Sequence, residues 1–135
     1  NVAKKTHNNL TKSLPFLVSM VPKSRAKNHF CSPEVIFLEN ETQIDGDGEK
    51  YYAINPHSYD RLETIEVRLH TGTISFEKIY NWCLILDKLR SITVPVFDNL
   101  DQFIEDVGFS DDLKKYIYER INKFHPNYKQ IQIAA

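Results

Sequence analysis

Residues 64–73 have the sequence TIEVRLHTGT and predict the strand around which the fold is organised. Successive side chains of a strand point to opposite faces of its sheet. Three apolar side chains therefore share one face and three ionisable side chains share the other: Ile65, Val67 and Leu69 against Glu66, Arg68 and His70. Because this alternation is typical of a half-buried antiparallel strand, we expect the apolar face to pack against helices. The ionisable face should border a concave, open side of the sheet.

A helix is predicted directly after this strand. Gly72 ends the strand, Ser75 is a good N-cap, and Glu77 suits the first turn, where the helix dipole favours a carboxylate. Apolar residues then recur at helical spacing as far as about Arg90. These residues are Ile79, Trp82, Cys83, Leu86 and Leu89. We expect this set to be the face that packs against the strand.

The remaining segments predict the fold class. Residues 51–55 are rich in strand formers, and the short apolar run 35–38 is consistent with a buried strand. Helices are predicted over residues 14–21, with Pro15 in the first turn, over 100–107, with Gly108 at the end, and after Ser110. Strands dominate the first half and helices the second. We therefore predict an α+β fold, with an antiparallel sheet in the first half covered on one face by about three C-terminal helices.

The length of 135 residues suits one domain with a single hydrophobic core. Residues 1–13 are polar and are predicted to form a flexible basic arm. Residues 14–126 are predicted to form a single α+β domain, and residues 127–135 a loose tail.

The charge distribution limits the classes of partner. The formal net charge of -1 gives no electrostatic reason to expect nucleic acid as the main partner. Residues 1–33 nevertheless contain basic side chains and no acidic one, whereas residues 34–49 are acidic. Two interpretations stay open: a solvated arm beside an acidic loop, or a basic segment that handles phosphate.

The cysteines and the hydropathy indicate a compartment. Cys31 and Cys83 lie far apart without a CxxC motif, which favours reduced thiols. No run approaches the roughly 20 apolar residues of a membrane-spanning helix. We therefore expect a cytoplasmic protein without a membrane partner.

The ionisable face has simpler explanations too. Glu66 and Arg68 are close enough to form an ion pair, and such a pair on the wet face of a sheet contributes little to stability. Cys31 with His29 or His70 could form a thiol nucleophile and its base, although isolated cysteines are commonly buried and inert.

Two separated motifs give the chain a resemblance to a known family. Residues 51–55, YYAIN, are followed by Arg61 and then by TIEVRLHTGT. This order is similar to an aromatic-rich strand ending in Asn, followed by T-[IV]-E-[FV]-R-x-H-x-G-T. Upstream, residues 24–31, SRAKNHFC, are similar to S-R-x-x-N-x-[YF]-C. Over residues 22–90 the chain thus resembles the amidoligases, ATP-dependent carboxylate–amine ligases related to glutamine synthetase.

The resemblance implies a chemistry and a set of residues. It implies ATP and Mg²⁺ as cofactors, and an acyl-phosphate route that joins a small-molecule or peptide carboxylate to an amine. Glu66 is then the metal ligand, Arg68 a catalytic residue that binds nucleotide phosphate, and Arg25 and His70 further catalytic residues. The types fit, because Mg²⁺ prefers hard oxygen ligands and a guanidinium matches a phosphate or carboxylate with two parallel bonds.

Two asparagines complete the implied site. Asn28 and Asn55 are implied to bind the cofactor, by orienting either the substrate or the backbone of a loop.

The resemblance is to the C-terminal part of the family only. Its N-terminal G-x-E-x-E strand and its H-x-H segment have no counterpart in this sequence. An N-terminal segment or a protein partner is therefore expected to complete an active ligase. The alternative is a non-catalytic interaction module of a larger assembly, for instance a viral or phage one. A nucleic-acid-binding domain is a third hypothesis, which rests on the basic residues 1–33 alone.

Overall fold

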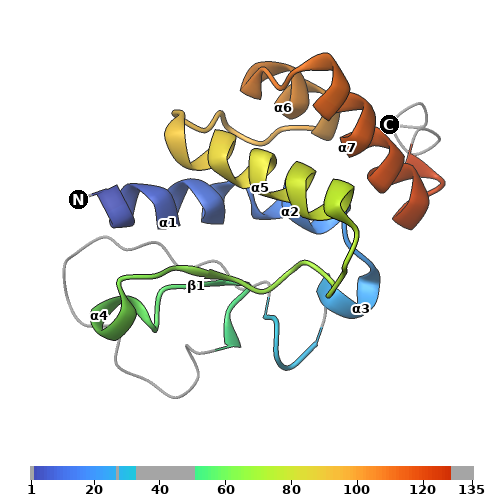
Figure 1. Cartoon of the computed structure of the whole chain (residues 1–135). Helices are drawn as coiled ribbons and strands as arrows, with labels where there is room; N and C mark the ends of the chain where they lie inside the picture. The colour runs from blue at the N-terminus through green and yellow to red at the C-terminus, as the bar shows by residue number, and fades with distance from the viewer. Residues whose placement is uncertain (1, 27, 33–50, 129–135) are drawn as a thin grey trace.

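The computed structural model describes residues 2–26, 28–32 and 51–128. Its elements follow in the order α1 (Val2–Lys12), α2 (Leu14–Ser19), α3 (Lys23–Ala26), β1 (Ile54–Asn55), α4 (Tyr59–Leu62), β2 (Glu66–Val67), α5 (Phe76–Ser91), α6 (Leu100–Val107) and α7 (Asp111–Phe124). Figure 1 shows three tiers: α6 and α7 on one side, α1, α2 and α5 in the middle, and the β1–β2 ribbon on the other side. The predicted strand 35–38 and the acidic stretch 34–49 lie outside the described residues.

The predicted α+β class is confirmed, with a small sheet. Among the described residues the sheet is one antiparallel pair, in which Ile54 lies opposite Val67 and Asn55 lies opposite Glu66. The strand pairing covers fewer residues than the alternation over residues 64–71 predicted, since β2 is Glu66–Val67. The Arg68 N–H still donates to the Ala53 carbonyl at 2.9 Å. The carbonyls of Arg68 and Leu69, however, accept hydrogen bonds from the Arg25 side chain and not from a strand.

The C-terminal helices form as their sequence predicts. The side chain of Asn99 caps α6 by accepting the Gln102 N–H at 2.8 Å, and Gly108 ends that helix in the left-handed conformation with φ 70°. The ring of Phe16 in α2 lies 5.2 Å from that of Phe103 in α6, between ring centroids, so the first and last thirds of the chain share one core. Helix α7 contacts α2 and α5, and helix α1 contacts β1.

The predicted flexible arm over residues 1–13 is wrong, because residues 2–12 form helix α1. His7 and Leu10 are buried, and α1 packs against α5 and β1. The buried Asn9 side chain donates to the carbonyls of Arg90 and Ile92 at 3.3 and 2.7 Å. These bonds satisfy main-chain acceptors at the end of α5, which have no partner within their own helix.

Helix α5 forms where predicted, with the Ser75 hydroxyl accepting the Lys78 N–H, and the predicted face is buried in part. Leu89 is fully buried, and Trp82 and Leu86 pack against the core, whereas the predicted core residues Ile79 and Cys83 are exposed. Apolar side chains occupy more than one face of this helix, so their spacing identified the buried face only in part.

The end of the chain is only partly described. Residues 129–135 of the predicted tail lie outside the described residues, and Tyr128 is half-buried against the core. Among residues 2–26, 28–32 and 51–128, no helix has both the length and the apolar character to cross a membrane.

Candidate functional site

Glu66 and Arg68 form the centre of the candidate site. Their side chains point to the same face of the strand and form an ion pair, with 2.9 Å between Arg68 Nη2 and Glu66 Oε2. The Glu66 side chain is 48% exposed and that of Arg68 is 26% exposed, so both groups are accessible to a ligand. Arg68 also donates to the Phe30 carbonyl at 3.4 Å, and its guanidinium lies 5.9 Å from the centre of the Tyr51 ring.

Arg25 lies directly against this strand. Its guanidinium donates through Nη2 to the Arg68 carbonyl and through Nε to the Leu69 carbonyl, across 43 and 44 residues of sequence. The two motifs that were matched separately in the sequence therefore meet in space. The contacts are to main-chain oxygens, so Arg25 holds the end of the strand in place.

Asn28 and Asn55 both act on loop backbone. Asn28 donates to the Ser24 carbonyl at 2.7 Å and accepts the Phe30 N–H at 2.8 Å. Asn55 accepts the His57 N–H at 2.8 Å and is only 2% exposed, so a bound nucleotide could not reach it. Of the two roles implied for these asparagines, the geometry supports the shaping of loops, a common use of asparagine.

His70 does not share the open face with Glu66 and Arg68. Its ring lies 5.0 Å from that of Trp82 in α5, and its Nδ1 lies 2.6 Å from the Thr71 carbonyl. A carbonyl only accepts, so Nδ1 carries the proton and Nε2 presents its lone pair. Nε2 is buried and lacks a hydrogen-bond partner within the described part of the chain.

Burial lowers the pKa of His70. The Thr71 hydrogen bond opposes this shift, while the charges of Arg120 and Lys78 lower the pKa further. A neutral ring with a free lone pair on Nε2 is a base by its chemistry. It faces α5, on a different side of the strand from the Glu66–Arg68 pair.

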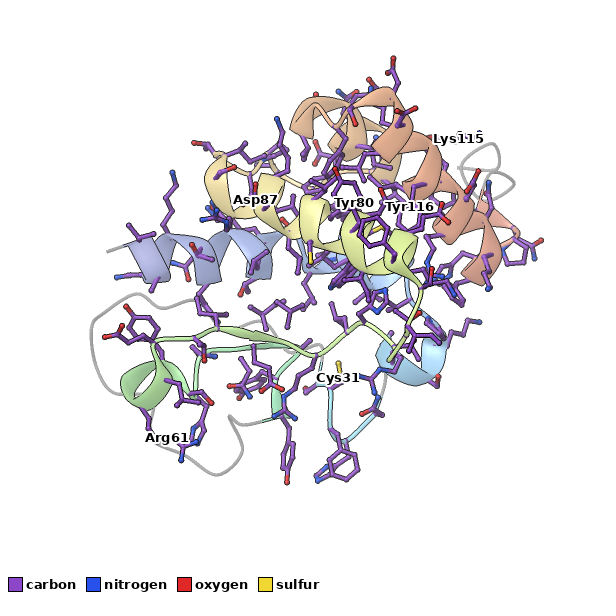
Figure 2. The ribbon with its side chains drawn as sticks, viewed as in Figure 1. Cys31, Arg61, Tyr80, Asp87, Lys115 and Tyr116 are labelled. Carbon is purple, nitrogen blue, oxygen red and sulfur yellow. The ribbon has the colours of Figure 1, made fainter. Side chains whose placement is uncertain are left out.

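Cys31 is a buried thiol beside the site. It is 1% exposed, and burial raises its pKa, although the charges of Arg25 and Arg68 oppose that shift. Figure 2 labels Cys31 on the side of the molecule where the strands lie. The His29 ring contacts Phe30 and Tyr51, with centroids 5.3 and 5.1 Å apart. A buried, protonated thiol is a poor nucleophile, which supports the structural interpretation of this cysteine.

The donor set at the strand is sparse for a metal. Within residues 2–26, 28–32 and 51–128 no group of three or more His, Cys, Asp or Glu side chains could hold a metal ion. Mg²⁺ is commonly held by one or two carboxylates together with substrate phosphates. The Glu66 carboxylate therefore fits Mg²⁺ that arrives with a nucleotide, and does not by itself form an all-protein site.

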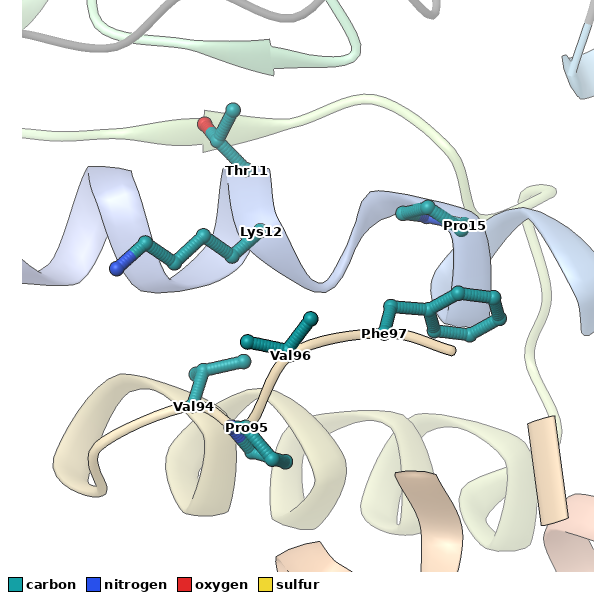
Figure 3. Close-up of a pocket in the computed structure, with 7 residues that line it drawn as sticks. All are labelled: Thr11, Lys12, Pro15, Val94, Pro95, Val96 and Phe97. Atoms are coloured by element: carbon teal, nitrogen blue, oxygen red, sulfur yellow. The ribbon is translucent and has the colours of Figure 1, made fainter. Parts of the chain in front are cut away.

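Two hollows in the described part of the chain border helix α1. The larger, about 820 Å³, is named here the α5 groove and lies between α1, β2 and α5. Its apolar lining includes Val2, Leu10, Ile65, Val67, Tyr80 and Leu84. The second, about 330 Å³, lies between α1–α2 and the segment after α5 (Figure 3), and is lined by Thr11, Lys12, Pro15 and residues 94–97. The α5 groove is on the Ile65–Val67 face of the strand, opposite Glu66, and the concave region beside the charged face stays a prediction.

No family model, no curated protein and no solved structure matches this chain. The amidoligase resemblance therefore rests on the residues of the two sequence motifs alone.

Proposed function

We propose that this chain contributes part of the active site of an ATP- and Mg²⁺-dependent carboxylate–amine ligase. The observation that carries the proposal is the contact of Arg25 with the main chain of Arg68 and Leu69. Two motifs that belong to one site should meet in the folded chain, whereas two chance matches have no reason to do so.

The proposed chemistry uses the charged pair on β2. A carboxylate becomes reactive toward an amine when it receives the γ-phosphoryl group of ATP. Attack of the amine nitrogen then forms the C–N bond and expels inorganic phosphate. Arg68 would bind the phosphoryl oxygens, whose negative charge a preorganised guanidinium stabilises. The nucleotide would then replace Glu66 as the partner of Arg68.

Glu66 would bind the metal ion. When bound, Mg²⁺ neutralises phosphate charge, and the freed Glu66 carboxylate is the protein ligand that would hold it. Arg25, Asn28 and Asn55 would position the strand and its loops, consistent with their bonds to backbone atoms. His70 faces α5 on the other side of the strand and its Nε2 is buried, so the proposed chemistry gives it no role.

The experiment measures ADP formation that depends on both an acid and an amine, with MgATP binding measured alongside. Glu66→Gln should retain the fold and lower turnover by about 100-fold or more, the loss typical of one preorganised electrostatic contact. Arg68→Lys should also lose activity, because an ammonium cannot form the two-pronged contact.

The chain offers a matched control in the ion pair between Lys114 and Glu105, which are 2.7 Å apart with exposures of 22% and 59%. Glu105→Gln breaks a pair of similar geometry on α6 and α7, and activity should be unchanged. Equal turnover in the wild type and Glu66→Gln would refute the role of Glu66. Failure of the wild type to bind MgATP would refute the ligase proposal for this chain.

The second candidate function is the non-catalytic interaction module. It is supported by the exposed apolar side chains of α5, among them Phe76 and Tyr80, which are 77% and 51% exposed. Loss of nucleotide binding together with intact partner binding would favour this module.

A further inference from the structure

Within residues 2–26, 28–32 and 51–128, the edge of β2 that faces away from β1 has no neighbouring strand. Among the described residues the sheet has the order β1–β2, so β2 has one neighbour there. A two-stranded sheet is marginally stable by itself, and an open strand edge is a template for pairing with another chain.

The register shows which main-chain groups point outward. The bond from the Arg68 N–H to the Ala53 carbonyl flanks the Ile54–Val67 pair, which identifies it as a non-hydrogen-bonded pair. The N–H and C=O of Val67 therefore point away from β1, toward the open edge. The Val67 side chain lines the α5 groove, so a strand added at this edge would place alternate side chains over α5.

Helix α5 presents an apolar face beside that edge. Phe76, Ile79, Tyr80 and Leu84 are 77%, 46%, 51% and 37% exposed. The rings of Phe76 and Tyr80 stack with centroids 5.5 Å apart. Figure 2 labels Tyr80 and Asp87 along the same helix. Contiguous exposure of this kind marks an interaction site more often than scattered single residues do.

We propose that the α5 groove and the open edge of β2 bind a second copy of this chain, related by a two-fold axis that passes beside Val67 and between Cys83 and Leu84. Two-fold dimers are the commonest oligomers, and their interface must be self-complementary. This proposal does not depend on the ligase activity.

The strand is self-complementary in one register. If Val67 pairs with Val67 of the second copy, their main chains exchange two hydrogen bonds. In the same register each Glu66 lies opposite an Arg68, so the ion pair that these residues form within one strand extends across the axis into a network of alternating charges. The register that places Ile65 opposite Val67 would set the two Glu66 carboxylates against each other, which is unfavourable.

The helix is self-complementary about the same axis. With two α5 helices antiparallel and centred between Cys83 and Leu84, Glu77 lies opposite Arg90 and Tyr80 lies opposite Asp87. Arg90 already pairs with Asp87 of its own helix at 2.6 Å, and Glu77 of the second copy would join this exposed pair. Each pairing joins residues on the exposed face of α5, and Cys83, Leu84, Asp87 and Arg90 line the groove together with Val67. Charge complementarity on strand and helix thus favours the same partner, a second copy.

The oligomeric state of the full chain tests the proposal by sedimentation velocity over a concentration series. The wild type should dimerise, and Leu84→Glu should abolish dimerisation because it places charge at the centre of the groove. Val96→Glu is the matched control, since Val96 is 82% exposed and lies on the other hollow. A wild type that stays monomeric to its solubility limit overturns the proposal, even if it binds another protein at this edge.

Charge exchange tests the helix register. Glu77→Arg and Arg90→Glu should each weaken dimerisation by about 3- to 30-fold, since two symmetry-related surface ion pairs are lost. The double variant should restore it, and Glu119→Arg on α7 should have no effect. Weakened single variants without restoration in the double variant overturn this arrangement of the helices.

Cross-linking tests proximity to the axis. A bis-maleimide of about 10 Å span should join two copies through the exposed Cys83, because packed helix axes lie about 8–10 Å apart. Cys83→Ser should abolish this product, since Cys31 is buried. Val67→Cys in the Cys83→Ser background should oxidise to a disulfide dimer, because Cα atoms of a hydrogen-bonded strand pair lie about 5.5 Å apart. Dimers that form neither product overturn the proposal.

Discussion

Arg25→Met tests whether the first motif stabilises the strand of the second. Methionine keeps a long apolar stem and removes the guanidinium, so two hydrogen bonds to main-chain carbonyls are lost. The bond to the Leu69 carbonyl is 3.5 Å long, beyond the usual range, and contributes little. The bond to the Arg68 carbonyl has a charged donor and is worth about 1.5–3 kcal/mol. Because Arg25 is partly exposed, we expect a loss near the lower end, about 1.5 kcal/mol.

Urea denaturation measures this loss. With a denaturant slope of about 1.5 kcal/mol/M, the midpoint should fall by about 1 M. Arg61→Met is the matched control, since Arg61 is exposed on α4, and an exposed substitution should change stability by less than about 0.5 kcal/mol. If Arg25→Met and Arg61→Met have the same midpoint, Arg25 does not hold the strand, and the observation that carries the proposed function loses its weight.

Two further predictions concern the fold. Burial holds the pKa of His7 below its ordinary value, so on acidification the unfolded chain binds a proton before the folded one does. The free energy of unfolding should fall as the pH drops below about 6.5 and level off only below the folded pKa. In urea titrations from pH 8 to 5, His7→Gln should reduce this dependence and His57→Gln, at an exposed position, should not. Gly108→Ala should lower the free energy of unfolding by about 1–2 kcal/mol, because alanine is strained in the left-handed conformation. A clash does not contribute, since an added Cβ would meet open space. Gly108→Asn should lower it less, because asparagine tolerates this conformation better. Equal melting temperatures for these two variants would contradict the strain argument.

The sequence predicts the helices of the second half because their signals are local. Asn99 and Ser110 cap α6 and α7, Gly108 ends α6, and one apolar face repeats through each helix. Helix α1 was not predicted, because the contacts that stabilise it are with residues far away in the sequence. Its polar residues His7 and Asn9 are buried against distant parts of the chain, and Asn9 finds its acceptors more than 80 residues away.

The candidate site was predictable in part. Alternation correctly placed Glu66 and Arg68 on one face, since two residues of paired strand are enough to fix the direction of neighbouring side chains. Alternation failed for His70, because the chain beyond Arg68 leaves the ladder and turns toward α5. The resemblance implied ligand contacts for Asn28 and Asn55, but in the structure these side chains form hydrogen bonds with the backbone of their own loops.

Helix α5 shows why periodicity alone cannot select a buried face. Ile85 and Leu89 form one apolar set at helical spacing, while Phe76, Tyr80 and Leu84 form another. A helix that is apolar on more than one side is buried on more than one side. The intramolecular core covers the first set. The second lies beside the edge of β2 at which, among the described residues, the main-chain groups of Val67 point outward, so one partner that supplies both a strand and a helix would cover both features. A second copy supplies both, in a register where acidic residues meet basic ones.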